Sequence, residues 1–547
     1  MSVAPQHLVI APILLPLVAG ALLLFFDDRE RLLKATVSIL TSVALLAISL
    51  ALLRMAHADG AADQGRVIVY LLGNWPPPFA INLVLDRLSA MMLVLTSLLA
   101  IPSLVFSIGR WHRAGPHFHT LFMFLLMGLN GAFLTGDLFN LFVFFEIMLA
   151  ASYGLMLHSS GTQRVKAGLH YIAINLVSAL LFLIGVALIY GTTGTLNMAD
   201  LAIQIPMVEP GSRIFLETGA AILGVAFLIK AGMWPLSFWL PTTYTAAPAP
   251  VAAIFAILSK VGVYVILRLS LLFFVETPDS SPGFGSWLLF IGGMATIAFG
   301  TFGVLASQAL GRLAGFSVLV SSGTLLATMG LLQVDVTAGA LFYLVSSTLA
   351  IGAFFLLIEL VERGQDSIAN VLAVTIEAFG EDGDEEEEED VVGVSIPGTL
   401  AILGISFGAC AILLAGLPPL SGFVAKFAML TAMLNPDGLG QGGTIPQSAW
   451  WLVAMLIVSG LAALISMSRA GIRAFWAPLE VRVPRVLLVE IAPVVALLFL
   501  TLALTTQAGP VMRYMEATAT SLYAPQSYIE GVMEAPRASR PEGGKGE

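Results

Sequence analysis

Two seven-residue stretches, AGMWPLS at residues 231–237 and AGLPPLS at residues 415–421, share the pattern A-G-x-x-P-L-S within strongly apolar surroundings. A proline inside a helix removes one backbone hydrogen bond and clashes with the carbonyl four residues earlier. In hydrocarbon, the backbone groups freed in this way must be satisfied by protein or water. Interrupted helices in corresponding positions of two halves indicate the working centre of a transporter. The pattern therefore predicts an internal repeat with one broken membrane helix in each half.

The chain as a whole has the composition of a membrane protein. Hydrophobic residues make up 58% of its 547 residues, and charged residues make up only 11%, which is too little charge to cover the surface of a soluble domain. Apolar runs long enough to cross roughly 30 Å of hydrocarbon lie near residues 8–26, 35–54, 82–107, 117–135, 138–158, 167–190, 214–234, 249–274, 285–307, 313–332, 337–361, 396–434, 450–468 and 486–507. We therefore predict an all-α polytopic membrane protein with about fourteen transmembrane helices, the seventh and twelfth being broken.

The Lys and Arg residues predict the orientation, because cytoplasmic loops carry more of them than the opposite loops. The richer side holds Arg29, Arg31, Lys34, Arg110, Arg113, Arg164, Lys166, Arg312, Arg363, Arg469, Arg473, Arg482 and Arg485. The opposite connections carry Arg54, Arg66, Arg87 and Arg213, with Arg268 near a helix end. Both termini are therefore expected outside the cytoplasm. The acidic run from Glu381 to Asp390 is expected inside it as a solvated loop, with a cation-collecting role as the alternative.

Several kinds of site are excluded by what the sequence lacks. One cysteine, Cys410, is too few for an iron–sulfur cluster or for the thiolate sets of structural zinc sites. The sequence has no P-loop and no HExxH motif, which argues against ATP-driven transport by this chain. No basic face is present for nucleic acid, and no cluster of carboxylates and carbonyls marks a sodium site. We expect neither a cofactor nor a bound metal.

Four ionisable residues lie well inside the apolar spans, namely Glu146, Lys230, Lys260 and Lys426. A charge at the bilayer centre costs about 2.5–3.5 kcal/mol on insertion scales, so these side chains must face the bundle interior, a partner or water. Buried lysine changes its protonation more readily than arginine, which suits a proton relay. Lys230 and Lys426 also flank the two helix breaks, where water can enter. A static set of ion pairs that only holds the helices together is the alternative. For Asp137 and for Asp86-Arg87, which open expected spans, a structural role is favoured.

Long stretches of the sequence resemble the D-type subunit of the Mrp-type (also called Pha-type) cation/proton antiporters. The similarity includes FMFLLMGLNGAFLTGDLFNLFVFFEIMLAASYGL within residues 121–155 and YGTTGTLNMADL at residues 190–201. It also includes KAGMWPLSFWLPTTYTAAPAPVAAIFAILSKVGVY at residues 230–264 and LAGLPPLSGFVAKFAML at residues 414–430. It covers roughly residues 80–475 and extends to the superfamily shared with the proton-pumping membrane subunits of respiratory complex I.

The resemblance implies a fourteen-helix fold that contains two inverted five-helix repeats. The first three helices would occupy residues 1–110, and the first repeat, helices four to eight, would occupy residues 111–274. The second repeat, helices nine to thirteen, would follow at residues 275–475 with an acidic cytoplasmic loop at 364–395. The last helix and an extracytoplasmic tail would occupy residues 476–547.

The resemblance also implies roles for the buried charges. Glu146 and Lys230 would form a pair that modulates proton transfer, Lys260 would be the central relay, and Lys426 would connect to the far side. Possible supporting residues are Asp137, Ser237, Ser346, Ser347 and Thr348. Many superfamily members carry histidine at the position of Ser237, and their eleventh helix often supplies a histidine or lysine where this chain has only hydroxyls. Passage between Lys260 and Lys426 is therefore expected to depend on hydroxyls and ordered water.

The function implied is that of a transporter subunit rather than an enzyme. The complex would export Na⁺ or K⁺ against proton uptake in the bacterial inner (cytoplasmic) membrane. Its other subunits would include a larger homologous subunit and several small membrane proteins. A proton-pumping membrane subunit of respiratory complex I or of a membrane-bound hydrogenase is the alternative, because those proteins share the fold and the buried charges.

Overall fold

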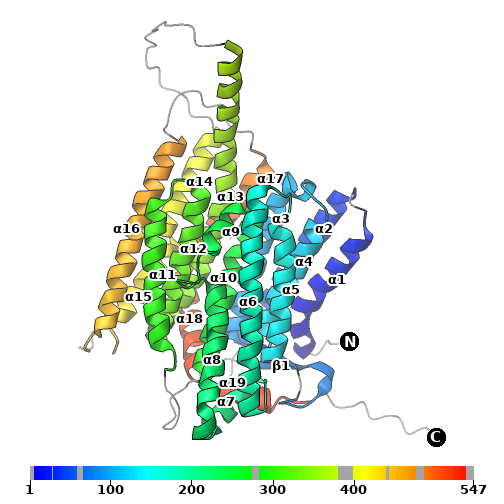
Figure 1. Ribbon diagram of the computed structural model, residues 1–547, viewed down its shortest axis with the longest axis vertical. Coiled ribbons are helices and arrows are strands. Elements are labelled where there is room, and N and C mark those ends of the chain that lie inside the picture. The colour runs from blue at the N-terminus through cyan, green and yellow to red at the C-terminus, as the bar shows by residue number, and fades with distance from the viewer. Residues whose placement is uncertain are drawn as a thin grey trace, which may run out of the picture.

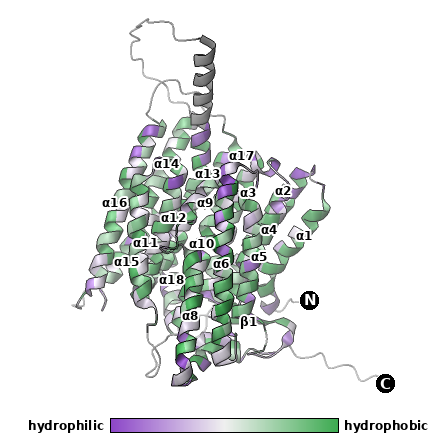
Figure 2. Cartoon of the chain, in the orientation of Figure 1, coloured by the Kyte–Doolittle hydropathy of each residue, from purple (hydrophilic) through white to green (hydrophobic). Residues whose placement is uncertain are grey.

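The chain folds into a bundle of long helices with a small two-stranded sheet at one end (Figure 1). This computed structural model describes residues 5–27, 29–57, 66–79, 81–273, 283–379, 398–438, 443–475 and 486–537, with the backbone alone for residues 364–379. Hydrophobic residues dominate the middle of the bundle, and hydrophilic residues are concentrated towards its two ends (Figure 2). This distribution is the one required of helices that cross a bilayer.

Thirteen of the described helices are long and apolar enough to cross a membrane. They are α1 (Ala11–Phe25), α2 (Arg31–His57), α3 (Arg87–Gly109), α5 (Leu138–Met156), α6 (Thr162–Thr193), α8 (Pro210–Ala231), α10 (Ala249–Phe273), α11 (Ser286–Ala306), α12 (Leu310–Met329), α13 (Val334–Phe379), α14 (Gly398–Ala415), α16 (Gln447–Phe475) and α17 (Leu488–Thr506). The shorter apolar helix α4 (Phe118–Leu134) occupies the fourth expected span. The half-helices α9 (Leu240–Ala246) and α15 (Ser421–Leu434) complete the seventh and twelfth. The predicted helical membrane fold is confirmed.

Both A-G-x-x-P-L-S stretches interrupt a helix at the same point of the motif. Helix α8 ends one residue before Gly232, which has a φ of 74°, and α14 ends one residue before Gly416, which has a φ of 75°. Glycine adopts this left-handed conformation without the steric cost that a Cβ would add. The two breaks that the sequence predicted are therefore present, and each ends in the same glycine geometry.

The remaining elements are short and, apart from η1, which belongs to the first span (Gln6–Phe25), they lie outside the spans. They are the helices α7 (Met198–Gln204), α18 (Ala508–Tyr523) and α19 (Gln526–Met533), the 3-10 turns η1 (Pro5–Ile10), η2 (Leu72–Asn74), η3 (Trp111–Arg113) and η4 (Ile205–Met207), and the strands β1 (Ile68–Leu71) and β2 (Asn82–Leu85). The strands pair antiparallel, so the third span begins at Arg87 rather than at the expected residue 82. Helix α13 continues to Phe379, beyond the start of the loop expected at 364–395. The acidic run Glu381 to Asp390 lies outside the described residues.

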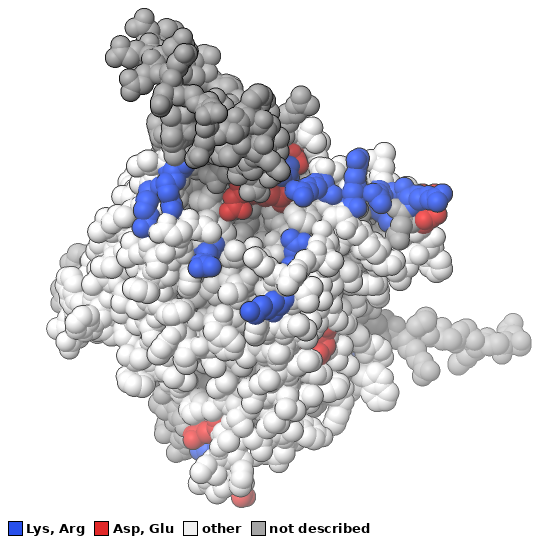
Figure 3. All heavy atoms as spheres, turned by 45° about the horizontal axis from the view of Figure 1, so that its top comes forward, with Lys and Arg blue, Asp and Glu red and all other residues white. Residues whose placement is uncertain are grey.

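Basic side chains gather at the end of the bundle where α13 extends beyond its neighbours (Figure 3). The helix ends there carry Arg110, Arg113, Arg164, Arg312, Arg469 and Arg473. The first and last described elements, η1 and α19, both contact β1 at the opposite end. The two ends of the described chain therefore lie on one side of the bundle, and which side faces the cytoplasm stays a prediction from the charge distribution.

Candidate functional site

Lys426 lies beside the second helix break and satisfies one of its freed backbone groups. Its Nζ donates to the carbonyl oxygen of Ala415, the last residue of α14, at 3.0 Å. Glycines make room for the side chain, because a Cβ added at Gly416 would lie 2.5 Å from its Cδ and one at Gly460 would lie 3.2 Å from its Nζ. The break therefore forms a pocket shaped to the lysine, as expected when irregular backbone is buried in a membrane protein.

Lys260 lies at the centre of the bundle, on a helix whose spanning residues are buried. The lysine is 0% exposed. Its Nζ donates to Ser321 Oγ at 2.8 Å and to Ser322 Oγ at 3.4 Å, both on α12. The sequence reasoning did not find these serines, because hydroxyl side chains are common in membrane helices and carry little signal by themselves.

A line of serine hydroxyls leads from Lys260 towards Lys426. Ser321 Oγ lies 2.9 Å from Ser347 Oγ on α13. The neighbouring Ser346 Oγ lies 2.8 Å from the Oγ of Ser421, which opens α15. Three of these serines, Ser321, Ser346 and Ser347, line a cavity of about 30 Å³. Its polar lining comprises Ser317, Ser321, Tyr343, Ser346, Ser347 and Ser459. A polar cavity of this size can hold a water molecule, so the hydroxyls and one water can connect Lys260 to Ser421. Ser421 lies on the same helix as Lys426, whose Nζ donates to the Ala415 carbonyl rather than to this line.

The other possible supporting residues lie apart from this line. Thr348 donates to the Leu344 carbonyl of its own helix at 2.6 Å. Ser237 is buried in the first break, and its hydroxyl has no hydrogen-bond partner among the described residues. Asp137 caps the start of α5 by accepting from Asn140 N at 2.8 Å, and burial raises the pKa of its carboxyl group. The capping role agrees with the structural interpretation of this aspartate.

Lys230 and Glu146 lie near each other but are not bound to each other. Lys230 Nζ donates to Asn175 Oδ1 of α6 at 2.6 Å, and it lies 5.9 Å from the centre of the Phe145 ring. The carboxylate of Glu146 is half-buried and close enough to act electrostatically on the lysine. Within the described ranges, Glu146 has no hydrogen bond and no ion pair within 4.0 Å. The sequence did not identify Asn175 as a partner of Lys230, although it does show a single amide side chain inside an apolar span.

The link between Lys230 and Lys260 is made by packing rather than by hydrogen bonds. A Cβ added at Gly262 of α10 would lie 2.7 Å from Ala231 N and 3.1 Å from the Cβ of Lys230. No side chain in the described part of the chain is hydrogen-bonded to both lysines. The close approach of α8 and α10 at Gly262 therefore brings the two lysines onto adjacent helices without a fixed bridge.

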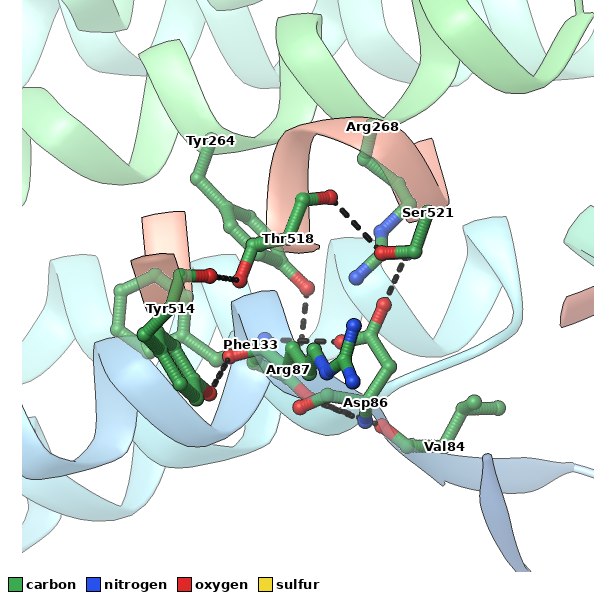
Figure 4. A network of polar contacts seen from close by, with 10 residues as sticks. Val84, Asp86, Arg87, Phe133, Tyr264, Arg268, Tyr514, Thr518 and Ser521 are labelled. Carbon is green, nitrogen blue, oxygen red and sulfur yellow. Dashed lines mark hydrogen bonds and ion pairs between the residues drawn. The ribbon is translucent and has the colours of Figure 1, made fainter. Parts of the chain in front are cut away.

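A second polar network closes the opposite end of the bundle from the basic side chains. Asp86 forms an ion pair with Arg268 of α10 at 2.5 Å and caps α3 by accepting from Ser89 N at 2.9 Å. Arg87 donates to the Ala517 carbonyl of α18 at 3.2 Å. Figure 4 shows that the network joins Asp86 and Arg87, at the start of α3, to residues of α4, α10 and α18. Its contacts tie helix ends together, in agreement with the structural role favoured for Asp86-Arg87.

Replacing Asp86 by Asn is expected to destabilise this end of the bundle. Burial raises the pKa of Asp86, but Arg268 and Ser89 outweigh burial and hold its pKa below the ordinary value of 3.8. The ion pair therefore stabilises the fold above about pH 4, and its contribution is lost as pH falls through the lower folded-state pKa. Breaking a buried pair costs about 3–5 kcal/mol. The thermal midpoint at pH 7 should fall clearly, whereas Glu217→Gln, at a more exposed pair, should change it little. Equal midpoints for the two variants would contradict this role.

Comparisons with known proteins agree with this architecture. Residues 135–439 match the family model described as NADH:quinone oxidoreductase/Mrp antiporter, TM. The probable D-type subunit of a K⁺/H⁺ antiporter from Rhizobium meliloti (strain 1021) is 61% identical, over 97% of this chain and 98% of that protein. The D-type subunit of an Na⁺/H⁺ antiporter from Alkalihalophilus pseudofirmus is 34% identical, over 97% of this chain and 100% of that protein. A chain of the Mrp complex from Dietzia sp. DQ12-45-1b superposes with a TM-score of 0.78 at 27% identity, covering 96% of this chain and 99% of that one.

Proposed function

Because the chain belongs to the NADH:quinone oxidoreductase/Mrp antiporter family of transmembrane proteins, we propose that it is the proton-translocating subunit of a multisubunit cation/proton antiporter. The complex uses inward proton flow to export a monovalent cation. K⁺ is the first candidate, because the 61% identical relative is named for K⁺/H⁺ exchange, and Na⁺ is the second. The partners are the other subunits of the complex, including a larger homologous subunit and several small membrane proteins.

The line of polar groups from Lys260 to Ser421, on the helix that carries Lys426, is the observation that carries this proposal. Protons pass along hydroxyls and water by exchange of hydrogen bonds, and the two lysines accept and release them at the ends of the line. Glu146 and Lys230 precede this line in the proposed proton path. The electrostatic attraction between them changes how firmly Lys230 holds its proton. The cation itself is assigned to the assembly. Among the described residues, no group of three or more His, Cys, Asp or Glu side chains is placed to hold a metal ion.

The redox alternative shares the fold and the charges, so the site itself does not discriminate between the two. The 61% identity to an antiporter subunit over 97% of the chain favours antiport. Purification of the intact complex tests the choice directly. Several small membrane subunits and no flavin or iron–sulfur protein are expected to accompany the chain, and recovery of redox subunits would overturn the assignment.

Replacing Lys230 by Ala is expected to reduce proton-driven cation exchange in vesicles by about tenfold or more, a typical size for a strong coupling between sites. The reason is that the variant removes the group through which Glu146 acts on the relay. Lys166→Ala, at an exposed position near the start of α6, should leave exchange unchanged. Co-purification of the other subunits shows whether the variant assembles.

A purely structural role for the charges makes the opposite prediction. If the pair only held helices together, Glu146→Gln combined with Lys230→Met would keep exchange intact, because two neutral side chains of similar size would still pack. Normal exchange in that double variant, or in assembled Lys230→Ala, would reject the relay.

A further inference from the structure

Helices α6 and α8 run antiparallel in close contact, and their register places Asn175 opposite Lys230. Ser178 Oγ donates to the Ala226 carbonyl of α8 at 3.0 Å. Further along the interface, a Cβ added at Gly185 would lie 2.8 Å from the α8 backbone. Along this interface, residue numbers rise on α6 as they fall on α8. The antiparallel pairing of the two helices therefore places the Asn175 amide beside Lys230.

The Asn175 amide is held in one orientation. Its Nδ2 donates to the Tyr171 carbonyl at 2.7 Å, and its Oδ1 accepts from Lys230 Nζ at 2.6 Å. A flipped amide would set two donor groups against each other and two oxygens against each other, because the ammonium only donates and the carbonyl only accepts. Asn175 therefore offers the lysine a fixed, neutral acceptor, and the residue is 1% exposed.

Two aromatic side chains, Tyr171 and Trp239, fix the backbone on both sides of this contact. The Tyr171 ring stacks on Trp239, with 5.4 Å between ring centres. Trp239 Nε1 donates to the carbonyl oxygen of Ile229, the residue before Lys230, at 3.2 Å. The helix that carries Asn175 and the broken helix that carries Lys230 are therefore held together at the point where the lysine leaves the backbone.

The free-energy cost of breaking the hydrogen bond is lower for a lysine bound to a neutral acceptor than for a lysine bound to a carboxylate. An ammonium bound to a carboxylate in a low-dielectric interior must separate opposite charges to move, whereas an amide is released without that cost. We propose that Asn175 is a positioning residue that holds Lys230 away from Glu146 between proton transfers. Lys230 then alternates between a neutral partner on α6 and a charged partner on α5. This assignment rests on the proposed relay function and adds a residue to it.

The surroundings of Lys230 limit which groups can affect its proton. Helix α5 contributes Glu146 and the Phe145 ring, α6 contributes Asn175, and α10 presents Gly262 against the lysine Cβ. Within the described part of the chain, Glu146 is the charged group that acts on the lysine. A new charge placed at position 175 should therefore have a clear effect.

The test is to replace Asn175 by Asp and by Leu in the full complex and to measure exchange in vesicles as a function of pH. Asn175→Asp adds a carboxylate in contact with the ammonium, so Lys230 keeps its proton to higher pH. The pH of half-maximal exchange should rise by about 1–3 units, the usual effect of an opposite charge at this range. Asn175→Leu removes the acceptor and leaves Glu146 as the remaining partner, so exchange at pH 7 should fall about tenfold without an alkaline shift.

Asn130 of α4 supplies the matched control, because it is also a buried amide whose Nδ2 donates to a carbonyl, that of Pro12, at 2.8 Å. Asn130→Asp should leave the pH profile unchanged, and co-purification of the other subunits reports assembly for every variant. A wild-type pH profile in assembled Asn175→Asp, or an equal shift in Asn130→Asp, would overturn the proposal. If Lys230→Ala abolishes exchange while Asn175→Asp behaves as wild type, only the role of Asn175 fails. If Lys230→Ala exchanges normally, the relay itself fails.

Discussion

Replacing Lys260 by Met is expected to abolish proton-driven cation exchange, reducing it by roughly 100-fold or more, the scale of a lost proton-transfer group. Lys260 is hydrogen-bonded to Ser321 and Ser322. Of these three side chains, the lysine is the one that can bind and release a proton, whereas a serine hydroxyl can only pass a proton on. Methionine has a similar length and no charge, and it removes the cost of burying an ammonium in a 0% exposed site. Assembly of the complex should therefore be preserved while transport is lost.

A second substitution at this position separates a carried proton from a fixed charge. Lys260→Arg keeps a positive charge that does not dissociate at any working pH. A relay predicts that it is as inactive as Lys260→Met, whereas a static electrostatic role predicts that it exchanges normally. Exchange measured in vesicles, together with recovery of the assembled complex, decides between them. Wild-type exchange in either assembled variant would remove Lys260 from the path.

Filling the serine cavity is expected to reduce exchange by about 100-fold, because proton passage between Lys260 and Lys426 then loses the two linking hydroxyls of α13 and the space for a water molecule. The double variant Ser346→Val with Ser347→Val removes the hydroxyls that bond Ser421 and Ser321 and places methyl groups in the cavity of about 30 Å³. The lysines themselves stay in place, so a loss of exchange would report on the connection rather than on its ends.

Thr348 provides the control for this experiment, since its hydroxyl bonds to the carbonyl of Leu344 in the same helix and it does not line the cavity. Thr348→Val changes a neighbouring hydroxyl to a methyl group without touching the serine line, and exchange should remain near the wild-type rate. A similar loss in Thr348→Val would indicate general damage to α13. Unchanged exchange in the assembled double variant would show that protons do not pass through the cavity.

The sequence was sufficient for features that depend on one helix at a time. The amino-acid sequence alone shows the apolar runs, the two proline breaks and the charges inside spans. Each of these features follows from the free-energy cost of exposing polar groups to hydrocarbon. Gly232 and Gly416 end their helices where the shared motif indicated. Lys230 and Lys426 beside those breaks were found for the same reason.

The partners of the charges could not be predicted, because they come from helices distant in the chain. Asn175 reaches Lys230 through the pairing of α6 with α8, and Ser321 reaches Lys260 through the contact of α10 with α12. Neutral polar residues are ordinary in membrane helices, so their identity alone carries little information. The strand β2 was missed for a different reason, since its apolar residues run directly into those of α3 and were counted with the span.

The polar network at the end opposite the basic side chains has a consequence for how the protein is made. A chain is synthesised from its N-terminus, so α3 and α10 enter the membrane long before α18 and α19 exist. The Tyr514 hydroxyl bonds to the Arg87 carbonyl, and Arg268 lies 5.0 Å from the ring centre of Tyr528. The polar ends of two early helices thus acquire these neighbours only after α18 and α19 have been made. Closure of this end of the bundle therefore requires α18 and α19 as well as the two early helices.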